Sequence, residues 1–255
     1  MNIKSIVVVL ILFQWCIPAK ADGRLSDNSV VSFISAKELH QSLSKSTVVD
    51  VRTTIEFDVL HVAGAHSITM SNLAFVPRIK ALCTAECNLV LYCNGGDCAK
   101  SEDAAEMLVK AGIKQVKVLS GGILNWVENY PEDSFLLGKK PVDKDKLVSE
   151  QEFNQRLLGF QQFEMKSQYE KHVVIDIRDN FQRGAAKERS SIKNSKSIPM
   201  NRLILLLDGE FAKDDTLLIY DAVGEQIKWI QYYLKDRGYQ NYYFLEGGAT
   251  SFPSD

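Results

Sequence analysis

Short apolar runs alternate with amphipathic segments along most of the chain. Residues 47–51 and 89–92 are rich in Val and Leu and are bounded by polar residues, which is typical of strands in a buried parallel sheet. Segments with helical spacing lie between such runs. One follows Ser35, a candidate N-cap, and another covers 101–111 and ends before Gly112, a candidate C-cap. This alternation predicts an α/β fold in which helices flank a mostly parallel sheet.

The chain nearly repeats itself with a period of about 126–130 residues. The matched segments are VVDVR at 48–52 with VIDIR at 174–178, HSITM at 66–70 with KSIPM at 196–200, LVLY at 89–92 with LLIY at 217–220, and KVLSGG at 117–122 with YFLEGG at 243–248. Because the matches keep one order, the pattern predicts two tandem α/β domains. We place them at residues 30–136 and 151–255, joined by a linker at 137–150.

The first 21 residues have the pattern of a secretory signal peptide. Lys4 precedes an apolar run at 6–13 that is shorter than a bilayer span, and Ala19 and Ala21 frame a small-x-small cleavage site. The pattern predicts cleavage after Ala21 and a periplasmic or secreted protein, with an uncleaved N-terminal anchor as the alternative. No later segment is apolar enough to span a membrane.

Composition and charge are those of an ordinary globular protein. Charged residues make up 24% of the chain and the net charge is −2, so no basic excess exists to attract nucleic acid. The sequence therefore predicts no nucleic-acid partner.

The cysteines are clustered rather than spread through the chain. Of five cysteines, the four beyond the signal segment are Cys83, Cys87, Cys93 and Cys98, all within sixteen residues. Such clustering indicates local redox or sulfur chemistry, or a metal site, rather than a disulfide framework. The spacing lacks the paired C-x2-C of zinc ribbons, so we expect no metal and no cofactor. Cys83 and Cys87 could form a local disulfide clip or a second relay pair.

Cys93 heads a glycine-containing loop between a predicted strand and a predicted helix. Backbone N–H groups of such a loop converge on its centre, and the helix dipole favours negative charge there. A cysteine at this place should have a lowered pKa. Gly95 and Gly96 let the chain curl, and Lys100 could add positive charge near a bound anion.

Taken together, these features resemble the rhodanese family of sulfurtransferases. The matching pieces are the strand–Cys93–loop–helix unit, the DVR strand at 50–52, HVAGA at 61–65 and the GG-x-x-x-W element at 121–126. The resemblance implies that Cys93 is the nucleophile, carrying a sulfane sulfur as a persulfide. It also implies an anion-binding loop, and it places Asp50 and Arg52 beside the pocket as supporting residues, although a structural salt bridge fits them equally well. The loop residues are Asn94, Gly95, Gly96, Asp97, Ala99, Lys100 and Ser101.

The loop departs from the family pattern in two ways. It is two residues longer than usual, and it ends in Lys100-Ser101 where the family has Arg-Ser. A longer loop could admit a larger oxyanion, as in related phosphatases, but lysine lacks the bidentate fork of arginine. Cys98 lies near the insertion. It is either a resolving thiol for Cys93 or a small residue at the base of the loop.

In the second repeat, Asp221 occupies the place of Cys93, and an aspartate cannot hold a persulfide. We therefore expect a catalytically silent second domain. The leading hypothesis is an exported sulfurtransferase that takes sulfur from a small sulfur-containing anion or a protein persulfide and passes it to a thiol acceptor or protein partner. A thiol–disulfide or persulfide carrier using Cys93 and Cys98, and a non-catalytic scaffold, are the alternatives.

Overall fold

The computed structural model describes residues 31–253 apart from 84–86, 97, 170 and 185–191. The predicted signal segment and Asp97 therefore lie outside the described residues. Residues 31–255 form one compact unit. Within the described part of the chain, no helix has the length and apolar character needed to cross a membrane.

The first half builds a five-stranded sheet in which all neighbouring strands are parallel. Its strands in spatial order are β1 (Ser32–Ile34), β6 (Val116–Leu119), β5 (Asn88–Tyr92), β2 (Ser46–Asp50) and β4 (His66–Ser67). Its helices are α1 (Ala36–Ser42), α2 (Thr54–Val59), α3 (Phe75–Leu82), α4 (Lys100–Lys110) and α5 (Gly122–Asn129). A small antiparallel pair, β3 (Leu60–Val62) with β7 (Ser134–Leu136), is added to this half.

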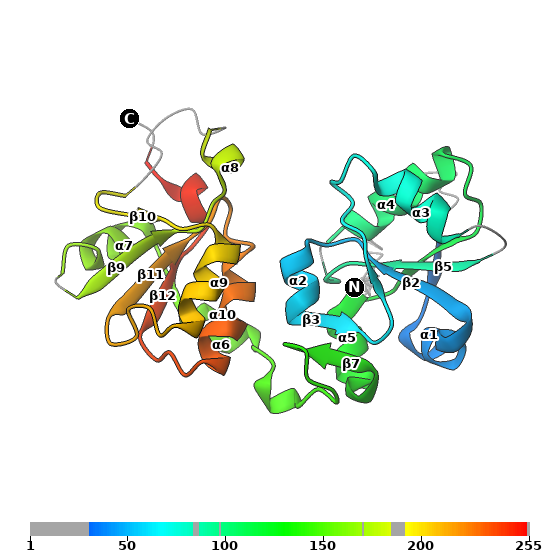
Figure 1. Cartoon of the computed structure of the whole chain (residues 1–255), viewed down its shortest axis with the longest axis horizontal. Coiled ribbons are helices and arrows are strands. Elements are labelled where there is room, and N and C mark those ends of the chain that lie inside the picture. The colour runs from blue at the N-terminus through cyan, green and yellow to red at the C-terminus, as the bar shows by residue number, and fades with distance from the viewer. Residues whose placement is uncertain (1–30, 84–86, 97, 170, 185–191, 254–255) are drawn as a thin grey trace, which may run out of the picture. The chain divides into compact units, whose positions relative to one another are not determined.

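The second half builds a sheet with the same topology (Figure 1). Its parallel strands in the matching order are β8 (Leu157–Leu158), β12 (Tyr242–Leu245), β11 (Thr216–Tyr220), β9 (His172–Asp176) and β10 (Lys196–Ser197). Its helices are α6 (Glu150–Asn154), α7 (Phe160–Lys166), α8 (Asn180–Gly184), α9 (Met200–Asp208) and α10 (Ile227–Asp236). The predicted fold class, two tandem α/β domains with parallel sheets, is confirmed.

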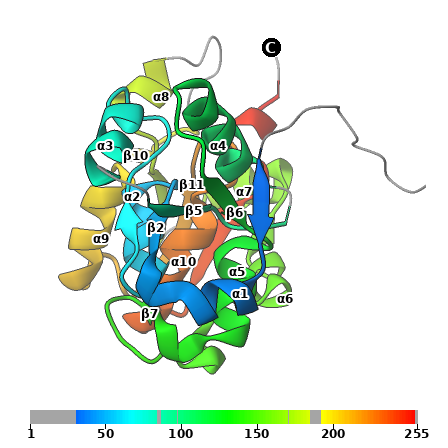
Figure 2. The same cartoon turned by 90° about the vertical axis from the view of Figure 1, so that its right-hand side faces the viewer.

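Burial explains why the apolar runs form the central strands. Four of the five residues of β5 are fully buried, as are four of the five in β11, its counterpart in the second half. Side chains on both faces of such a strand pack against helices, which a continuous apolar run makes possible. β2 and β5 lie side by side at the centre of the first sheet (Figure 2).

A side-chain cap marks the start of α1, and a glycine follows the end of α4. Ser35 caps α1 and forms a capping box with Glu38, as its position in the sequence predicted. α4 covers Lys100–Lys110, and Gly112 follows it with a φ of 90°.

Because β2 and β5 are parallel, their carboxyl ends lie at one edge of the sheet, and Asp50 is in register with Tyr92. This edge therefore brings Asp50 next to the residue that precedes Cys93.

Candidate active site

Cys93 is the first residue after β5, in the loop that leads into α4. We call residues 93–99 the Cys93 loop. The side chain of Cys93 is only 2% exposed. Its Sγ accepts a hydrogen bond from the Ser101 hydroxyl at 3.3 Å, and it lies 2.9 Å from the carbonyl oxygen of Cys98. The loop thus curls around a single sulfur atom.

Hydrogen-bond donors around Cys93 favour its thiolate. The largest effect is a hydrogen bond from the Cys98 thiol, joined by the backbone N–H groups of Gly95 and Ser101 and by the Ser101 hydroxyl. Burial opposes them, yet the pKa of Cys93 falls to about 5. Among the described residues, the neutral thiol has one acceptor, the Cys98 carbonyl oxygen, whereas the thiolate gains four donors, so the charged form is the better fit.

Cys98 takes the opposite role in this pair. It is a free, half-buried cysteine, and the hydrogen bond to Cys93 raises its pKa, with burial as the second cause. A strong donor beside a strong acceptor is the arrangement in which one sulfur holds the proton and the other holds the charge. The structure therefore distinguishes a buried thiolate from a more accessible thiol.

Two pairs of glycines fit together at this site. Gly95 has a φ of 91°, and a Cβ on it would lie 2.0 Å from the carbonyl oxygen of Gly121. A Cβ on Gly122 would lie 2.4 Å from the carbonyl oxygen of Cys93. The N–H of Ile123 donates to that same carbonyl at 2.9 Å. The Gly-Gly element was identified from the sequence only as part of a motif, and its contact with the Cys93 loop explains why both positions lack a side chain.

Asp50 and Arg52 support the Cys93 loop from beneath. Arg52 is 1% exposed, and its Nε and Nη2 bind the two carboxylate oxygens of Asp50 at 2.9 and 2.6 Å. Its Nη1 donates to the Asn94 side chain at 2.9 Å. Asp50 and Arg52 thus form a buried salt bridge, and Arg52 also holds the loop through Asn94. The two roles that the sequence left open, a structural salt bridge and support of the pocket, are therefore compatible.

Glu56 is a functional candidate that sequence reasoning missed. Its Oε1 accepts from the Asn94 amide at 3.1 Å, and its other oxygen closes a capping box with Thr53 at the start of α2. The Thr-x-x-Glu spacing could have revealed the cap, but not the contact with a loop 38 residues away.

A cleft of about 400 Å³ opens beside the Cys93 loop, and residues of both halves line it. Cys98 and Lys100 line it from the first half, and Glu225, Lys228 and Trp229 line it from the second. The Lys100 ammonium lies 3.5 Å from the Glu225 carboxylate. Burial lowers the pKa of Lys100, but the nearby carboxylates raise it more, so the side chain stays cationic.

The second half contains a similar loop with a different centre. Asp221 is 1% exposed, and its two carboxylate oxygens accept from the N–H groups of Gly224 at 2.5 Å and Gln226 at 2.6 Å. Burial raises the pKa of Asp221 in spite of these donors. Asp176 and Arg178 repeat the buried pair beneath it. A carboxylate thus fills the space into which the loop amides point.

Cys83 and Cys87 are joined by a disulfide with a Cα–Cα distance of 5.6 Å. They lie between the end of α3 and the start of β5. The local clip was one of the two alternatives left open by the sequence, and the structure contains it.

Other candidate sites in the described residues lack comparable chemistry. His40, Glu132 and Asp133 come within reach of one metal ion, but Asp133 already pairs with His40 and Lys140. The histidine most relevant to the predicted motif, His61, is stacked on Phe57 and has a pKa lowered mainly by burial.

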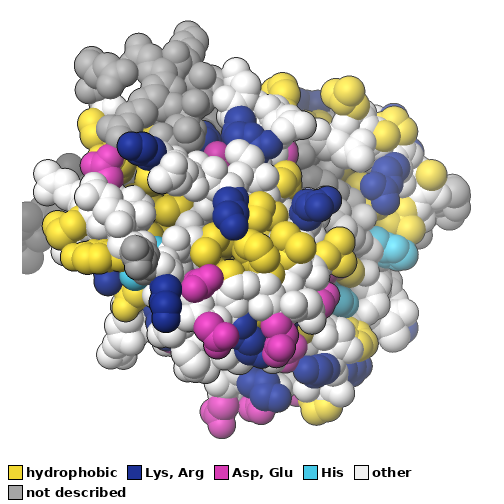
Figure 3. Space-filling model, turned by 60° about the vertical axis from the view of Figure 1, so that its left-hand side comes forward, with side chains coloured by type: hydrophobic (Ala, Val, Ile, Leu, Met, Phe, Trp, Pro, Cys, Tyr) yellow, Lys and Arg dark blue, Asp and Glu magenta, His cyan; other side chains and the backbone are white. Residues whose placement is uncertain are grey.

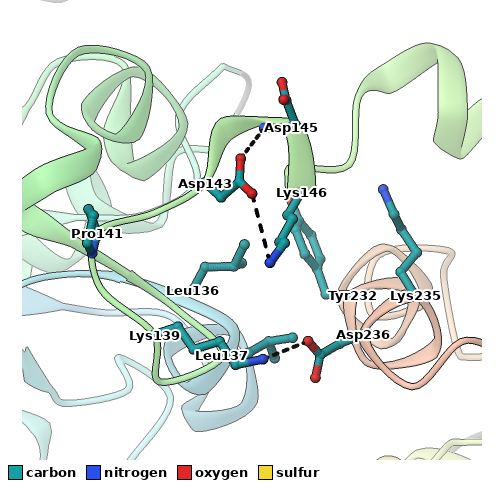
Figure 4. A pocket seen from close by; sticks show the side chains of 10 residues that line it. All are labelled: Leu136, Leu137, Lys139, Pro141, Asp143, Asp145, Lys146, Tyr232, Lys235 and Asp236. Atoms are coloured by element: carbon teal, nitrogen blue, oxygen red, sulfur yellow. Dashed lines mark hydrogen bonds and ion pairs between the residues drawn. The ribbon is translucent and has the colours of Figure 1, made fainter.

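A second cavity, of about 330 Å³, lies where the segment after β7 meets α10 (Figure 4). Two ion pairs lie among its lining residues, Lys139 with Asp236 and Lys146 with Asp143. No cysteine or histidine is among the described residues that line it. On the face drawn in Figure 3, acidic and basic side chains are interspersed among hydrophobic ones, in keeping with the near-neutral composition.

Comparison with known proteins places these features in a family. A profile of the rhodanese-like domain matches the chain twice, over residues 35–129 and 161–255. The probable adenylyltransferase/sulfurtransferase MoeZ of Mycobacterium tuberculosis is 32% identical over 111 residues, which cover 40% of this chain and 26% of MoeZ. The HTH-type transcriptional regulator Rv0324 of the same organism is 38% identical over 80 residues, which cover 31% of this chain and 34% of the regulator. The chain thus spans about a quarter to a third of the length of these relatives.

Among solved structures, thiosulfate sulfurtransferase from Pseudomonas aeruginosa is similar over 86% of this chain and 42% of that protein, with 20% identity and a TM-score of 0.39. The two profile matches lie in the two halves that the internal repeat and the paired sheets define. Together they cover most of the residues. The chain therefore belongs to the rhodanese-like family and carries two rhodanese-like domains in tandem.

Proposed function

We propose that this protein is a sulfurtransferase that carries sulfane sulfur on Cys93. The observation that supports this most directly is the set of four donors around the Cys93 sulfur, which lowers its pKa to about 5. At neutral pH such a thiol is almost entirely ionised, and the thiolate is the nucleophilic form.

The proposed reaction has two transfers. The Cys93 thiolate attacks the outer sulfur of a donor such as thiosulfate, the S–S bond of the donor breaks, and sulfite leaves with the bonding electron pair. Cys93 then holds a persulfide, with the charge on its outer sulfur. A thiophilic acceptor, such as a thiolate, attacks that outer sulfur and releases the Cys93 thiolate. Polysulfides and protein persulfides can also serve as donors, because each presents a sulfane sulfur.

The direct test is the intact mass of the reduced protein before and after incubation with thiosulfate. The wild type should gain the mass of one sulfur atom, and peptide mapping should place it on Cys93. Cys93→Ser should gain none and should lose sulfur transfer, while Cys98→Ser should still form the adduct. If Cys93→Ser acquires the adduct as readily as the wild type, the proposal fails.

A thiol relay is a second candidate, favoured by a difference in access. Cys98 lines the cleft, whereas Cys93 is 2% exposed. The Cys98 thiol could pass its proton to the outer sulfur of the Cys93 persulfide and then attack that sulfur, which would leave a persulfide on Cys98 at the cleft and a thiolate on Cys93. In that case, the adduct should map partly to Cys98, and Cys98→Ser should slow transfer to a protein acceptor more than transfer to cyanide.

We also propose that the protein is exported, with cleavage after Ala21. The disulfide between Cys83 and Cys87 supports this proposal, because such bonds persist mainly in oxidising compartments. N-terminal sequencing of the mature protein should begin at Asp22. A native protein that retains Met1 and stays in the cytoplasm would contradict export without affecting the proposed chemistry.

For the second domain we propose a supporting role. Asp221 offers no sulfur, and its carboxylate already uses the loop amides that would otherwise attract an anion. The domain lines the cleft with side chains of its own, so its contribution would be to substrate selection rather than to bond making. The scaffold alternative predicts that Cys93→Ser leaves the biological phenotype intact.

A further inference from the structure

The cleft beside the Cys93 loop holds an ion pair between the two domains. Glu225 lies in the segment between β11 and α10, and its carboxylate is 3.5 Å from the Lys100 ammonium at the start of α4. Both side chains line the cleft, and both remain partly exposed, at 71% for Glu225 and 45% for Lys100. The pair therefore stands where a donor in solution would reach the Cys93 loop.

The ion pair between Lys100 and Glu225 reduces the positive charge that an anion meets in the cleft. Lys100, the first residue of α4, presents an ammonium group to the cleft, and α10 adds that of Lys228. The carboxylate of Glu225 neutralises part of that positive charge. Glu56, in the first domain, also interacts electrostatically with the Lys100 ammonium. A dianion entering the cleft is attracted by the two lysines and repelled by Glu225, whose carboxylate lies 3.5 Å from the Lys100 ammonium.

We propose that Glu225 is a specificity-determining residue, which weakens binding of small dianionic sulfur donors and favours donors that carry less negative charge. The inference rests on the proposed sulfur transfer at Cys93 and names the donor class of that site. The second domain would then select donors by their charge, because Glu225 belongs to the domain whose own loop holds Asp221.

The expected size follows from Coulomb interaction near a protein surface. Removing one negative charge close to the bound donor should lower the KM for thiosulfate about three- to tenfold at low salt, with a smaller change in kcat. The interaction scales with donor charge, so a monoanionic donor should show about the square root of that factor. The difference should shrink as ionic strength rises.

The experiment compares Glu225→Gln with the wild type, using thiosulfate as the dianionic donor and methanethiosulfonate as the monoanionic one. Glu210→Gln is a matched control, because Glu210 is also 71% exposed, also pairs with a lysine and does not line the cleft. We expect Glu225→Gln to lower the KM for thiosulfate more than that for methanethiosulfonate, and Glu210→Gln to change neither.

The possible results separate the inference from the function on which it rests. Equal KM values for thiosulfate in Glu225→Gln and the wild type, with the Cys93 persulfide forming in both, would overturn the inference and leave sulfur transfer standing. The same shift in Glu210→Gln, or an equal shift for both donors, would also overturn it. Failure of every variant to form a Cys93 persulfide with either donor would overturn both proposals.

Discussion

The hydrogen bond between the two free cysteines is the contact whose removal should change the chemistry of the site most directly. Replacing Cys98 with alanine deletes the donor that does most to lower the pKa of Cys93. The other donors, on Gly95 and Ser101, remain, and so does the burial that opposes them. The pKa of Cys93 should therefore rise without reaching the value of a free cysteine.

The size of the shift follows from the strength of a charge-assisted hydrogen bond. Such a bond contributes about 1.5–3 kcal/mol, and one pKa unit corresponds to about 1.4 kcal/mol. The pKa of Cys93 should then rise from about 5 to about 6–7 in Cys98→Ala. Serine keeps a hydroxyl donor at this place, so Cys98→Ser should shift the pKa less.

The assay is the rate of Cys93 alkylation by iodoacetamide between pH 4 and pH 10, followed by peptide mass. The midpoint of the profile is decisive, because a thiolate of higher pKa is also intrinsically more nucleophilic, with a Brønsted slope of about 0.4–0.5. The plateau at high pH should therefore rise in Cys98→Ala while the midpoint moves upward. Identical midpoints in Cys98→Ala and the wild type would refute the role of Cys98. A wild-type midpoint near about 8.5, the value of free cysteine, would refute the thiolate itself.

Two further predictions concern the support of the Cys93 loop. Gly122→Ala should abolish persulfide formation and lower the melting temperature, because the new Cβ would clash with the backbone of the Cys93 loop. Gly138 is a control, since it has a similar positive φ but open space around it. Gly138→Ala should lower the melting temperature only slightly and leave persulfide formation unchanged. Arg52→Lys and Arg178→Lys should each lower the free energy of unfolding by about 1–3 kcal/mol in denaturant titrations, because lysine keeps the positive charge but loses the bidentate hydrogen bonds to the buried aspartate. Only Arg52→Lys should also shift the Cys93 alkylation midpoint, because that arginine holds the Cys93 loop, and equal midpoints in the two variants would contradict this role.

Features that depend on nearby residues could be predicted from the sequence. The central strands follow from continuous apolar runs, since only strands covered on both faces tolerate them. The cap at Ser35 follows from its own side chain and from Glu38. The duplicated sheet order follows from the repeat, because similar segments in one order fold alike. The backbone part of the lowered pKa of Cys93, from the N–H groups of Gly95 and Ser101, follows from a strand–loop–helix unit that is contiguous in the chain, whereas the larger effect of the Cys98 thiol does not.

Features that depend on distant pairings could not be predicted in the same way. Glu56 accepts a hydrogen bond from Asn94, 38 positions away in the chain, and the sequence pattern of neither segment predicts this contact. The ion pair between Lys100 and Glu225 depends on how two folded domains meet, and periodicity carries no information about that. The asymmetry of the two free cysteines is of the same kind, because their spacing alone does not say which sulfur will be buried.

The two loops together separate what the backbone contributes from what a single side chain contributes. Both domains have a buried Asp–Arg pair and glycines that pack against the loop, and in both loops backbone N–H groups converge on one acidic group. In one loop that group is a thiolate, which can form and break a bond to sulfur. In the other it is the Asp221 carboxylate, which offers no sulfur. Because the loop amides stabilise either anion, such a loop alone does not imply catalysis, and the proposed sulfur transfer depends on the identity and ionisation of the Cys93 sulfur.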